Sequence, residues 1–280
     1  SGIFFIRLRR RMHKLESQIY KSKLQTTSEE FKKNKESMLG MLEEIDTLLD
    51  EAEAGGGPDH QKRLAARGKL PVRERIFNFL DPDSPFLEIS GLAGYKSDYP
   101  VGGGAVAGIG VCSGIECIIF ANDPTVLAGA MHYYSVKKWM RSMAIARDCR
   151  IPFIQFVESA GGDLRPRGAM SAGAMGHFAE SGRQFYEITE LSKLNIPTVT
   201  VTFGTATAGG AYQPGMSDYN IFVKDQADVA LAGPPLVQMA TGEISSREEI
   251  GGAKMHAEKS GLAEYLADDD LDGIRIAREV

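Results

Sequence analysis

Two apolar runs rich in β-branched residues, each leading to a pair of glycines, constrain the fold of this chain more than any other feature. Residues 151–157 lead to the glycines at 161–162, and residues 196–203 lead to those at 209–210, about 48 positions later. Both runs start with Ile-Pro and have the composition of buried strands. A helical pattern follows each pair, and this alternation of strand and helix predicts an α/β domain with a largely parallel sheet.

A Gly-Gly pair after a strand also has a chemical interpretation. Without a Cβ atom, backbone N–H groups can approach a bound oxygen closely, and a helix that opens there adds positive partial charge. Active sites of parallel sheets lie at the carboxyl ends of their strands, where both pairs fall. A single Gly-Gly is more often a plain turn, but two pairs in matching contexts favour an oxyanion hole built from main chain.

Composition narrows the classes of function. The 280 residues are 43% hydrophobic and 25% charged with a net charge of −5, which predicts an ordinary globular chain of one or two domains with no preference for nucleic acid. No apolar run approaches the ~18 residues of a membrane span. The three cysteines and five scattered histidines lack ligand spacing. We therefore expect free thiols and no metal, in the cytoplasm or, in a eukaryote, the mitochondrial matrix.

Periodicity and turn residues predict the remaining elements. Residues 10–54 have a helical pattern that ends at Gly55–Pro58, so residues 1–58 form a predicted helical extension. The chain starts with Ser1, as expected of a processed end, a tag remnant or a fragment edge. The other expected helices cover about 59–80, 128–149, 170–194, 208–217 and 234–240. The other expected strands cover 86–89, 105–112, 116–122 (a hairpin with 105–112), 152–157, 197–203, 219–223 and 228–231.

Three shorter motifs fail on their context. Residues 102–107 match a relaxed dinucleotide fingerprint, but a turn precedes them and a hairpin follows, where the fingerprint needs a strand and a helix. Ser159 sits in an incomplete nucleophile elbow whose first glycine is missing, and His177 is not placed by sequence to serve as its base. Asp268–Asp270 reads as an acidic helix cap rather than a metal site.

Longer stretches carry a specific resemblance. They are Arg67–Arg75 (RGKLPVRER), Ala121–Thr125 (ANDPT), Phe156–Gly162 (FVESAGG), Thr207–Tyr212 (TAGGAY), Ala232–Val237 (AGPPLV), Thr241–Glu243 (TGE) and Glu249–Ala253 (EIGGA). Over about residues 15–280 the chain resembles the amino-terminal carboxyltransferase domain of biotin-dependent acyl-CoA carboxylases of the β-subunit type. It looks most similar to the methylcrotonyl-CoA and geranyl-CoA branch. Gln213–Gly215 and His256 depart from the pattern, which leaves the acyl chain of the substrate open.

The resemblance implies a crotonase-like fold, a ββα superhelix, with an N-terminal helical extension. It divides the chain into the extension at 1–58 and an acyl-CoA carboxyltransferase domain at 59–280. Relatives of this type have a second, C-terminal carboxyltransferase domain, which this chain lacks. We therefore expect either a fragment or a partner half on another polypeptide.

The resemblance also implies a reaction. Carboxybiotin on a separate carrier domain or subunit releases CO2, the freed biotin nitrogen takes a proton from the acyl-CoA, and the enolate attacks the CO2. The amides of Gly161 and Gly162 would hold the thioester oxygen, with Gly209 and Gly210 in the loop that shapes the pocket floor. The other implied substrate contacts are Ala160, Arg165, Arg167, Ala208, Ala211 and Tyr212, of which the two arginines would meet the CoA phosphates.

The expected partners are a biotin carboxylase or biotin carrier subunit and the C-terminal carboxyltransferase domain, within a homo- or hetero-oligomer and without nucleic acid or membrane. Two alternatives remain. A CoA-thioester decarboxylase or hydratase/isomerase could use the same fold, and a hydratase would need a positioned carboxylate such as Glu158 or Asp163. A non-catalytic structural subunit of a carboxylase complex is the second.

Overall fold

The computed structural model describes residues 21–163 and 178–280. The chain divides into two compact units, residues 1–44 and 45–280. Helix α1 (Glu29–Ala54) starts after Ser28, whose hydroxyl accepts the Phe31 N–H at 3.1 Å, and none of its residues is buried. Residues 21–28 are not helical, so the predicted start near residue 10 is wrong for this stretch, and residues 10–20 lie outside the described part.

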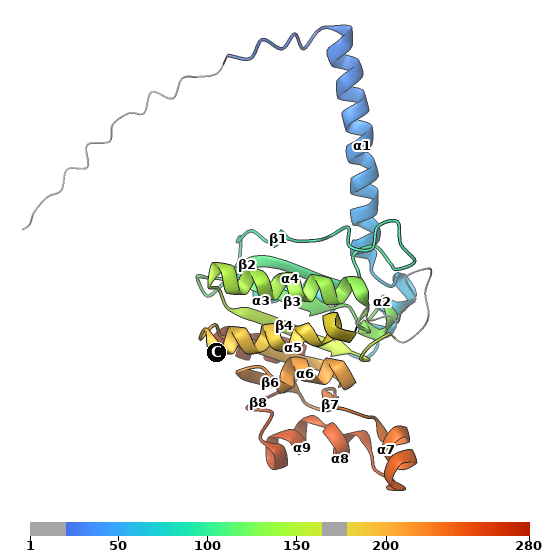
Figure 1. The fold of residues 1–280 in the computed structure, drawn as a ribbon, viewed down its shortest axis with the longest axis vertical. Helices are drawn as coiled ribbons and strands as arrows, with labels where there is room; N and C mark the ends of the chain where they lie inside the picture. Colours follow the sequence, from blue (N-terminus) through green and yellow to red (C-terminus); the bar gives the residue numbers. More distant parts are fainter. Residues whose placement is uncertain (1–20, 164–177) are drawn as a thin grey trace, which may run out of the picture. The chain divides into compact units, whose positions relative to one another are not determined.

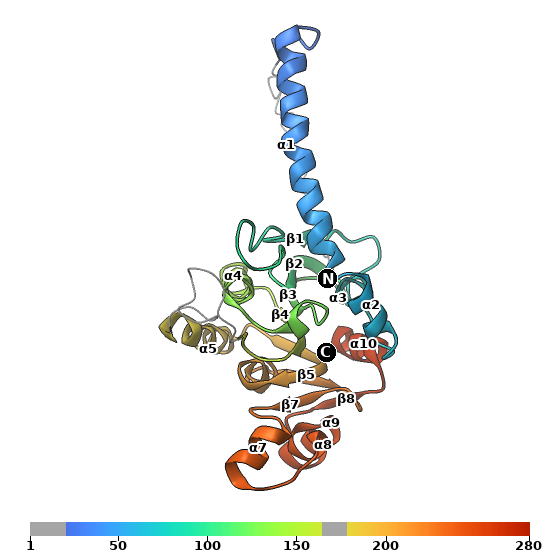
Figure 2. The same ribbon diagram turned by 90° about the vertical axis from the view of Figure 1, so that its right-hand side faces the viewer.

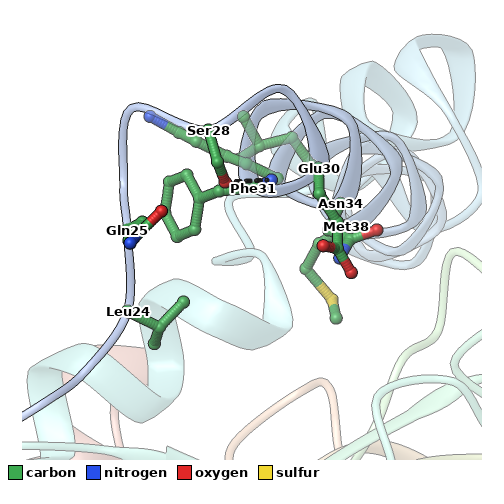
Figure 3. Close-up of a pocket in the computed structure, with 9 residues that line it drawn as sticks. Leu24, Gln25, Ser28, Glu30, Phe31, Asn34 and Met38 are labelled. Atoms are coloured by element: carbon green, nitrogen blue, oxygen red, sulfur yellow. Dashed lines mark hydrogen bonds between the residues drawn. The ribbon is translucent and has the colours of Figure 1, made fainter.

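A hollow beside the first turns of α1 is lined by side chains of the first unit (Figure 3). Leu24, Phe31 and Met38 supply much of its apolar lining, and Ser28 and Glu30 supply polar atoms. The hollow contains none of the residues that the sequence singles out, and those of them that the structure describes lie in the second unit.

The helix predicted over 59–80 is two helices, α2 (Pro58–Ala65) and α3 (Val72–Phe79). Gly68 has a left-handed backbone with a φ of 72°, and Pro71 directly precedes α3. Both features end a helix, so the chain turns between the two segments. This break brings Lys69 and Arg75, both from the RGKLPVRER stretch, against the sheet.

An eight-stranded sheet forms the centre of the second unit (Figure 1). Its order is β1-β2-β3-β4-β5-β6-β8, and β7 pairs with β5 beyond the end of β6. The first three strands are antiparallel and the rest are parallel, as predicted for the glycine-ended strands. The strands are β1 (Leu87–Glu88), β2 (Ala105–Cys112), β3 (Ile115–Asn122), β4 (Phe153–Ser159), β5 (Thr198–Thr207), β6 (Tyr219–Val223), β7 (Asp228–Ala230) and β8 (Tyr265–Ala267).

Helices cover both faces of this sheet (Figure 2). Helices α4 (Tyr133–Cys149) and α5 (Phe178–Lys193) bury Trp139 and Leu191 against one face, and α3 and α10 (Asp270–Glu279) bury Phe79 and Ile274 against the other. Successive residues of a strand serve opposite faces, because side chains alternate along it. Each cluster therefore draws on alternate positions of the central strands, which fixes their register.

The segment after β5 is made of short elements. A 3-10 turn, η2 (Ala208–Ala211), and α6 (Tyr212–Gly215) replace the single helix predicted for 208–217. Strands β6 and β7 and helix α7 (Pro234–Thr241) lie within a residue of prediction. Sequence patterns did not indicate α8 (Arg247–Gly251), α9 (Ala253–Met255), the π turn at His256–Ser260 or β8. Among the described helices, none combines the length and apolarity needed to cross a membrane.

Candidate active site

The two glycine pairs meet at the carboxyl edge of the sheet. Strands β4 and β5 are parallel neighbours, with Ser159 beside Ala206 at their ends. A Cβ atom on Gly161 would lie 2.8 Å from the Thr207 carbonyl oxygen, and one on Gly210 would lie 3.2 Å from the Ser159 side chain. Neither position has room for a larger residue without movement of its neighbours. The parallel order of the two strands thus brings together turns that are about 48 residues apart.

Most amides of the first turn have partners inside the protein. The Ala160 N–H donates to the Ala128 carbonyl at 3.1 Å, and the Asp163 N–H donates to the Met131 carbonyl at 2.8 Å. Gly161 N–H donates to the Ser159 hydroxyl at 3.2 Å. Gly162 is half-buried, and its N–H has no hydrogen-bond partner among the residues that the structure describes. Within the described residues, therefore, only Gly161 of the predicted pair has a partner for its N–H, the Ser159 hydroxyl.

The second turn presents its amides at the start of η2. Ala208 has a left-handed backbone with a φ of 51°, a costly conformation for alanine, and its residue is exposed. The first N–H groups of a helical turn have no partner within it. A Cβ atom on Gly209 would meet nothing within 4 Å, so open space lies before this residue. This space lies in the turn that packs against the first glycine turn through Gly161 and Gly210.

The other predicted contacts differ in their positions. Ala160 is exposed, whereas Ala211 is buried. Tyr212 is 40% exposed, and its ring lies 4.6 Å from the Phe185 ring of α5. Arg165, Arg167 and His177 lie outside the described residues. Ser159 is buried and its hydroxyl holds the Gly161 amide, so its observed contact is structural.

A buried ion network lies under the first turn, and sequence reasoning missed it. Lys69 Nζ is 2.6 Å from Glu158 Oε1 and donates to the Phe203 carbonyl at 2.9 Å. Arg75 lies between two acids, with Nη2 3.0 Å from Glu158 Oε2 and Nε 2.9 Å from Asp270 Oδ2. Its guanidinium also stacks 4.2 Å from the centre of the Phe203 ring. The basic residues of the RGKLPVRER stretch are visible in the sequence, but nothing there identifies their acidic partners.

This network determines what Glu158 can do. Both carboxylate oxygens are in ion pairs, with the half-buried Lys69 and the buried Arg75, and a Cβ on neighbouring Gly204 would lie 2.6 Å from the carboxyl group. A general base must reach the proton it abstracts. Glu158 instead joins α3 to the strand that carries the first glycine turn.

The glycines at 102–104 form no nucleotide site. All three have positive φ angles, of 87°, 68° and 65°, and they make the turn that leads into β2. The buried Lys138 ammonium donates to the carbonyls of Gly102 at 3.0 Å and Ala105 at 2.6 Å. Desolvation by burial lowers the pKa of Lys138 to about 8. No group of three metal-ligating His, Cys, Asp or Glu side chains occurs in the described part of the chain.

Comparison with known proteins identifies the family to which this chain belongs. The carboxyl transferase domain family matches residues 63–280. A probable biotin-dependent acyl-CoA carboxylase β2 subunit of Mycobacterium tuberculosis is 49% identical over 244 residues, which are 87% of this chain and 45% of that protein. A probable mitochondrial methylcrotonoyl-CoA carboxylase β chain of Drosophila melanogaster is 40% identical over 97% of this chain and 47% of its own length.

The fold agrees with solved structures. The β subunit of Pseudomonas aeruginosa geranyl-CoA carboxylase superposes with a TM-score of 0.79 at 42% identity, over 93% of this chain and 48% of that one. This agreement confirms the crotonase-like α/β fold with a helical N-terminal part. The chain is a member of the carboxyl transferase domain family, as the resemblance indicated. It spans about half the length of the relatives it matches.

Proposed function

We propose that this chain is the acyl-CoA-binding half of the carboxyltransferase component of a biotin-dependent acyl-CoA carboxylase. The observation that carries the proposal is the Gly162 N–H, which has no partner in the described residues and lies where the two glycine turns meet. The names of the relatives favour a substrate of the 3-methylcrotonyl-CoA or geranyl-CoA type.

The proposed chemistry uses main chain rather than an ionisable side chain. When a CoA thioester loses its α proton, or its vinylogous γ proton, negative charge develops on the thioester oxygen. Carboxybiotin, when bound, supplies the CO2 and the nitrogen base. The Gly162 amide, with Gly161 and the Ala208–Gly210 loop around it, would hold the charged oxygen. A fixed donor of this kind contributes about 2.7–4 kcal/mol to such a transition state.

The remaining assignments belong to the same proposal. Arg165 and Arg167 would contact the CoA phosphates, and Ala160, Ala211 and Tyr212 would line the thioester. Biotin would arrive on a separate carrier. A C-terminal carboxyltransferase domain, for which the relatives are long enough, would supply the biotin-binding side of the active site. The assembly would be an oligomer, in the cytoplasm or in the mitochondrial matrix.

One observation weighs against the hydratase alternative. Glu158, one of the two carboxylates that the alternative needs, is paired through both oxygens with Lys69 and Arg75. Moving Glu158 out of this network would leave Lys69 without a carboxylate partner and Arg75 with Asp270 alone, at a cost of several kcal/mol. The alternative would then rest on Asp163 alone.

Reconstitution tests the proposal. The chain is combined with a C-terminal carboxyltransferase half and a biotin-bearing partner, then supplied with ATP, labelled bicarbonate and a panel of acyl-CoAs. We expect label in a carboxylated acyl-CoA that depends on this chain and on biotin. Water addition to an enoyl-CoA without bicarbonate would favour the hydratase, and acyl-CoA binding without any turnover would favour the structural subunit.

A further inference from the structure

Met131 pairs with both sides of the first glycine turn. Its N–H donates to the Gly161 carbonyl at 2.7 Å, and its carbonyl accepts the Asp163 N–H at 2.8 Å, so Met131 forms a parallel bridge to Gly162. This bridge lies outside the regular strands, at the end of the segment that links β3 to α4.

The bridge fixes the direction of one particular amide. The carbonyl of Gly161 and the N–H of Gly162 belong to the same peptide unit, which is planar and trans. In such a unit the two groups point in opposite directions. Because Met131 holds the carbonyl from one side, the Gly162 N–H is aimed away from Met131, toward the side where it has no partner in the described structure.

The Met131 side chain is held just as specifically. The thioether is buried, and its Sδ accepts from Asn122 Nδ2 at 3.2 Å and from Gln213 Nε2 at 3.9 Å. Asn122 ends β3, and Gln213 lies on α6, directly after the second glycine turn. One sulfur atom thus joins the support of the first turn to the helix that follows the second.

The side-chain amides of Asn122 and Gln213 are unusual groups to bury next to a thioether. Asn122 and Gln213 are 1% and 0% exposed, and the oxygens Asn122 Oδ1 and Gln213 Oε1 have no partner in the part of the chain described. A buried amide with an unpaired oxygen is costly, and a thioether is only a weak acceptor. Apolar side chains would fill the space at lower cost, so stability alone does not explain the pair.

We infer that Met131 is a positioning residue that aims the Gly162 amide at the thioester oxygen, and that Gln213 and Asn122 act through its sulfur to set the aim. The inference rests on the proposed function, since it assigns how that oxyanion donor is oriented. It also gives Gln213, which departs from the family pattern, a role in coupling the two glycine turns.

The test uses calorimetry to measure the affinity of this chain for a ligand that carries a charged oxygen. Two ligands are compared: a CoA analogue with a stable oxyanion at the thioester position, such as a nitronate, and a CoA thioether that lacks the oxygen. The ratio of the affinity for the oxyanion analogue to that for the thioether reports whether the donor points at the oxygen. A general weakening of the CoA site affects both ligands and leaves this ratio unchanged. Thermal unfolding of each variant shows whether it is folded.

The variants remove the sulfur contact and keep side-chain volume. We expect Met131→Leu and Gln213→Met each to reduce the affinity ratio about tenfold, a fraction of the roughly 10²–10³ that loss of a whole donor costs. The double variant should be no worse than the poorer single variant, because both act through one sulfur. Thr202→Val, which removes a buried hydroxyl that has no hydrogen-bond partner in the described structure, Met131 included, should leave the ratio unchanged.

The outcomes separate the inference from the function. If the unaltered chain prefers the oxyanion analogue and folded Met131→Leu and Gln213→Met keep that preference, the positioning role is overturned and the proposed function stands. A ratio that falls equally in Thr202→Val also overturns it, because the effect would be general. If the unaltered chain binds both ligands equally, the proposed function and the inference fall together. Either single variant suffices where the other does not fold.

Discussion

Arg75 and Asp270 are 195 positions apart in the chain, and Arg75 Nε donates to Asp270 Oδ2 at 2.9 Å inside the protein. Asp270 also accepts the Leu70 N–H at 3.0 Å, so one carboxylate ties the loop before α3 to the start of α10. With Glu158 on the other side of Arg75, this pair links the two helices on one face of the sheet to the strand that ends in the first glycine turn.

Arg75→Met is expected to lower the free energy of unfolding by about 3–5 kcal/mol, because two buried carboxylates lose their shared cation. Urea unfolding measures the effect. Lys224→Met is the matched control, since its partner Asp268 is 77% exposed and such a surface pair contributes about 1 kcal/mol at most. Equal losses of unfolding free energy in the two variants would show that the buried network stabilises the fold no more than a surface ion pair does.

Gly162→Val is expected to abolish carboxyl transfer in the reconstituted complex while the chain remains folded. A side chain at this position would stand between the amide and the approaching thioester oxygen, so the loss should be at least about 10²-fold in kcat. Steady-state kinetics measures the loss, and circular dichroism checks the fold. Unchanged turnover in a folded variant would remove Gly162 from the site.

Gly161→Ala is expected to destabilise the fold rather than only the chemistry. Gly161 has a φ of 91°, and its new Cβ would lie 2.8 Å from the Thr207 carbonyl oxygen, so the cost should be roughly 2 kcal/mol or more. Gly182→Ala in α5 is the control, because a Cβ there meets nothing within 4 Å. Chemical denaturation of both should give a loss for Gly161→Ala and a gain of up to about 1 kcal/mol for Gly182→Ala.

Lys138 makes stability depend on pH on the alkaline side. Desolvation lowers its pKa from 10.5 to about 8 in the folded protein, so between these values the unfolded chain binds more protons than the folded one. Unfolding free energy therefore rises with pH across that window, as the buried lysine sheds its charge. Relative to Lys138→Met, the intact protein should gain roughly 3 kcal/mol from pH 8 to 10.5. A flat difference between the two across this range would contradict the assignment.

The three free cysteines should react in an order set by burial. Cys149 is exposed, whereas Cys112 and Cys117 are buried, and desolvation raises the pKa of Cys117 to about 12. A thiol-specific reagent at neutral pH should modify Cys149 in the native protein and Cys117 only on unfolding, because the thiolate is the reactive form. Mass spectrometry of timed samples identifies the modified peptide. Early labelling of Cys117 would mean that β3 opens readily.

Local pattern predicted the parts of the fold that depend on local chemistry. Strands β2 and β3 and their turn were expected within a residue, because apolar runs flank Ser113-Gly114, which adopts the two positive φ angles of a tight hairpin turn. The order of strand and helix predicted a largely parallel sheet with both glycine pairs at the carboxyl ends of its strands. The structure adds that β4 and β5 are direct neighbours, which brings the two turns together.

The supports of the site could not be predicted in the same way. Residues 128–132 were assigned to a helix that in fact begins at Tyr133, because nothing in the sequence marks Leu127 and Ala128 as left-handed, with φ angles of 51° and 54°. The Met131 bridge and the Arg75 network are long-range contacts. Residue type and spacing do not reveal such contacts, because they depend on which elements finally pack together.

The sheet ends in two very short strands, β1 of two residues and β8 of three. An exposed strand edge invites another chain to extend the sheet, and shortness is one way to prevent this. With so few main-chain groups on offer at either end, a second polypeptide cannot readily join by adding a strand. Assembly with larger partners would then depend on complementary side-chain surfaces, which discriminate between partners where a bare backbone edge would accept almost any.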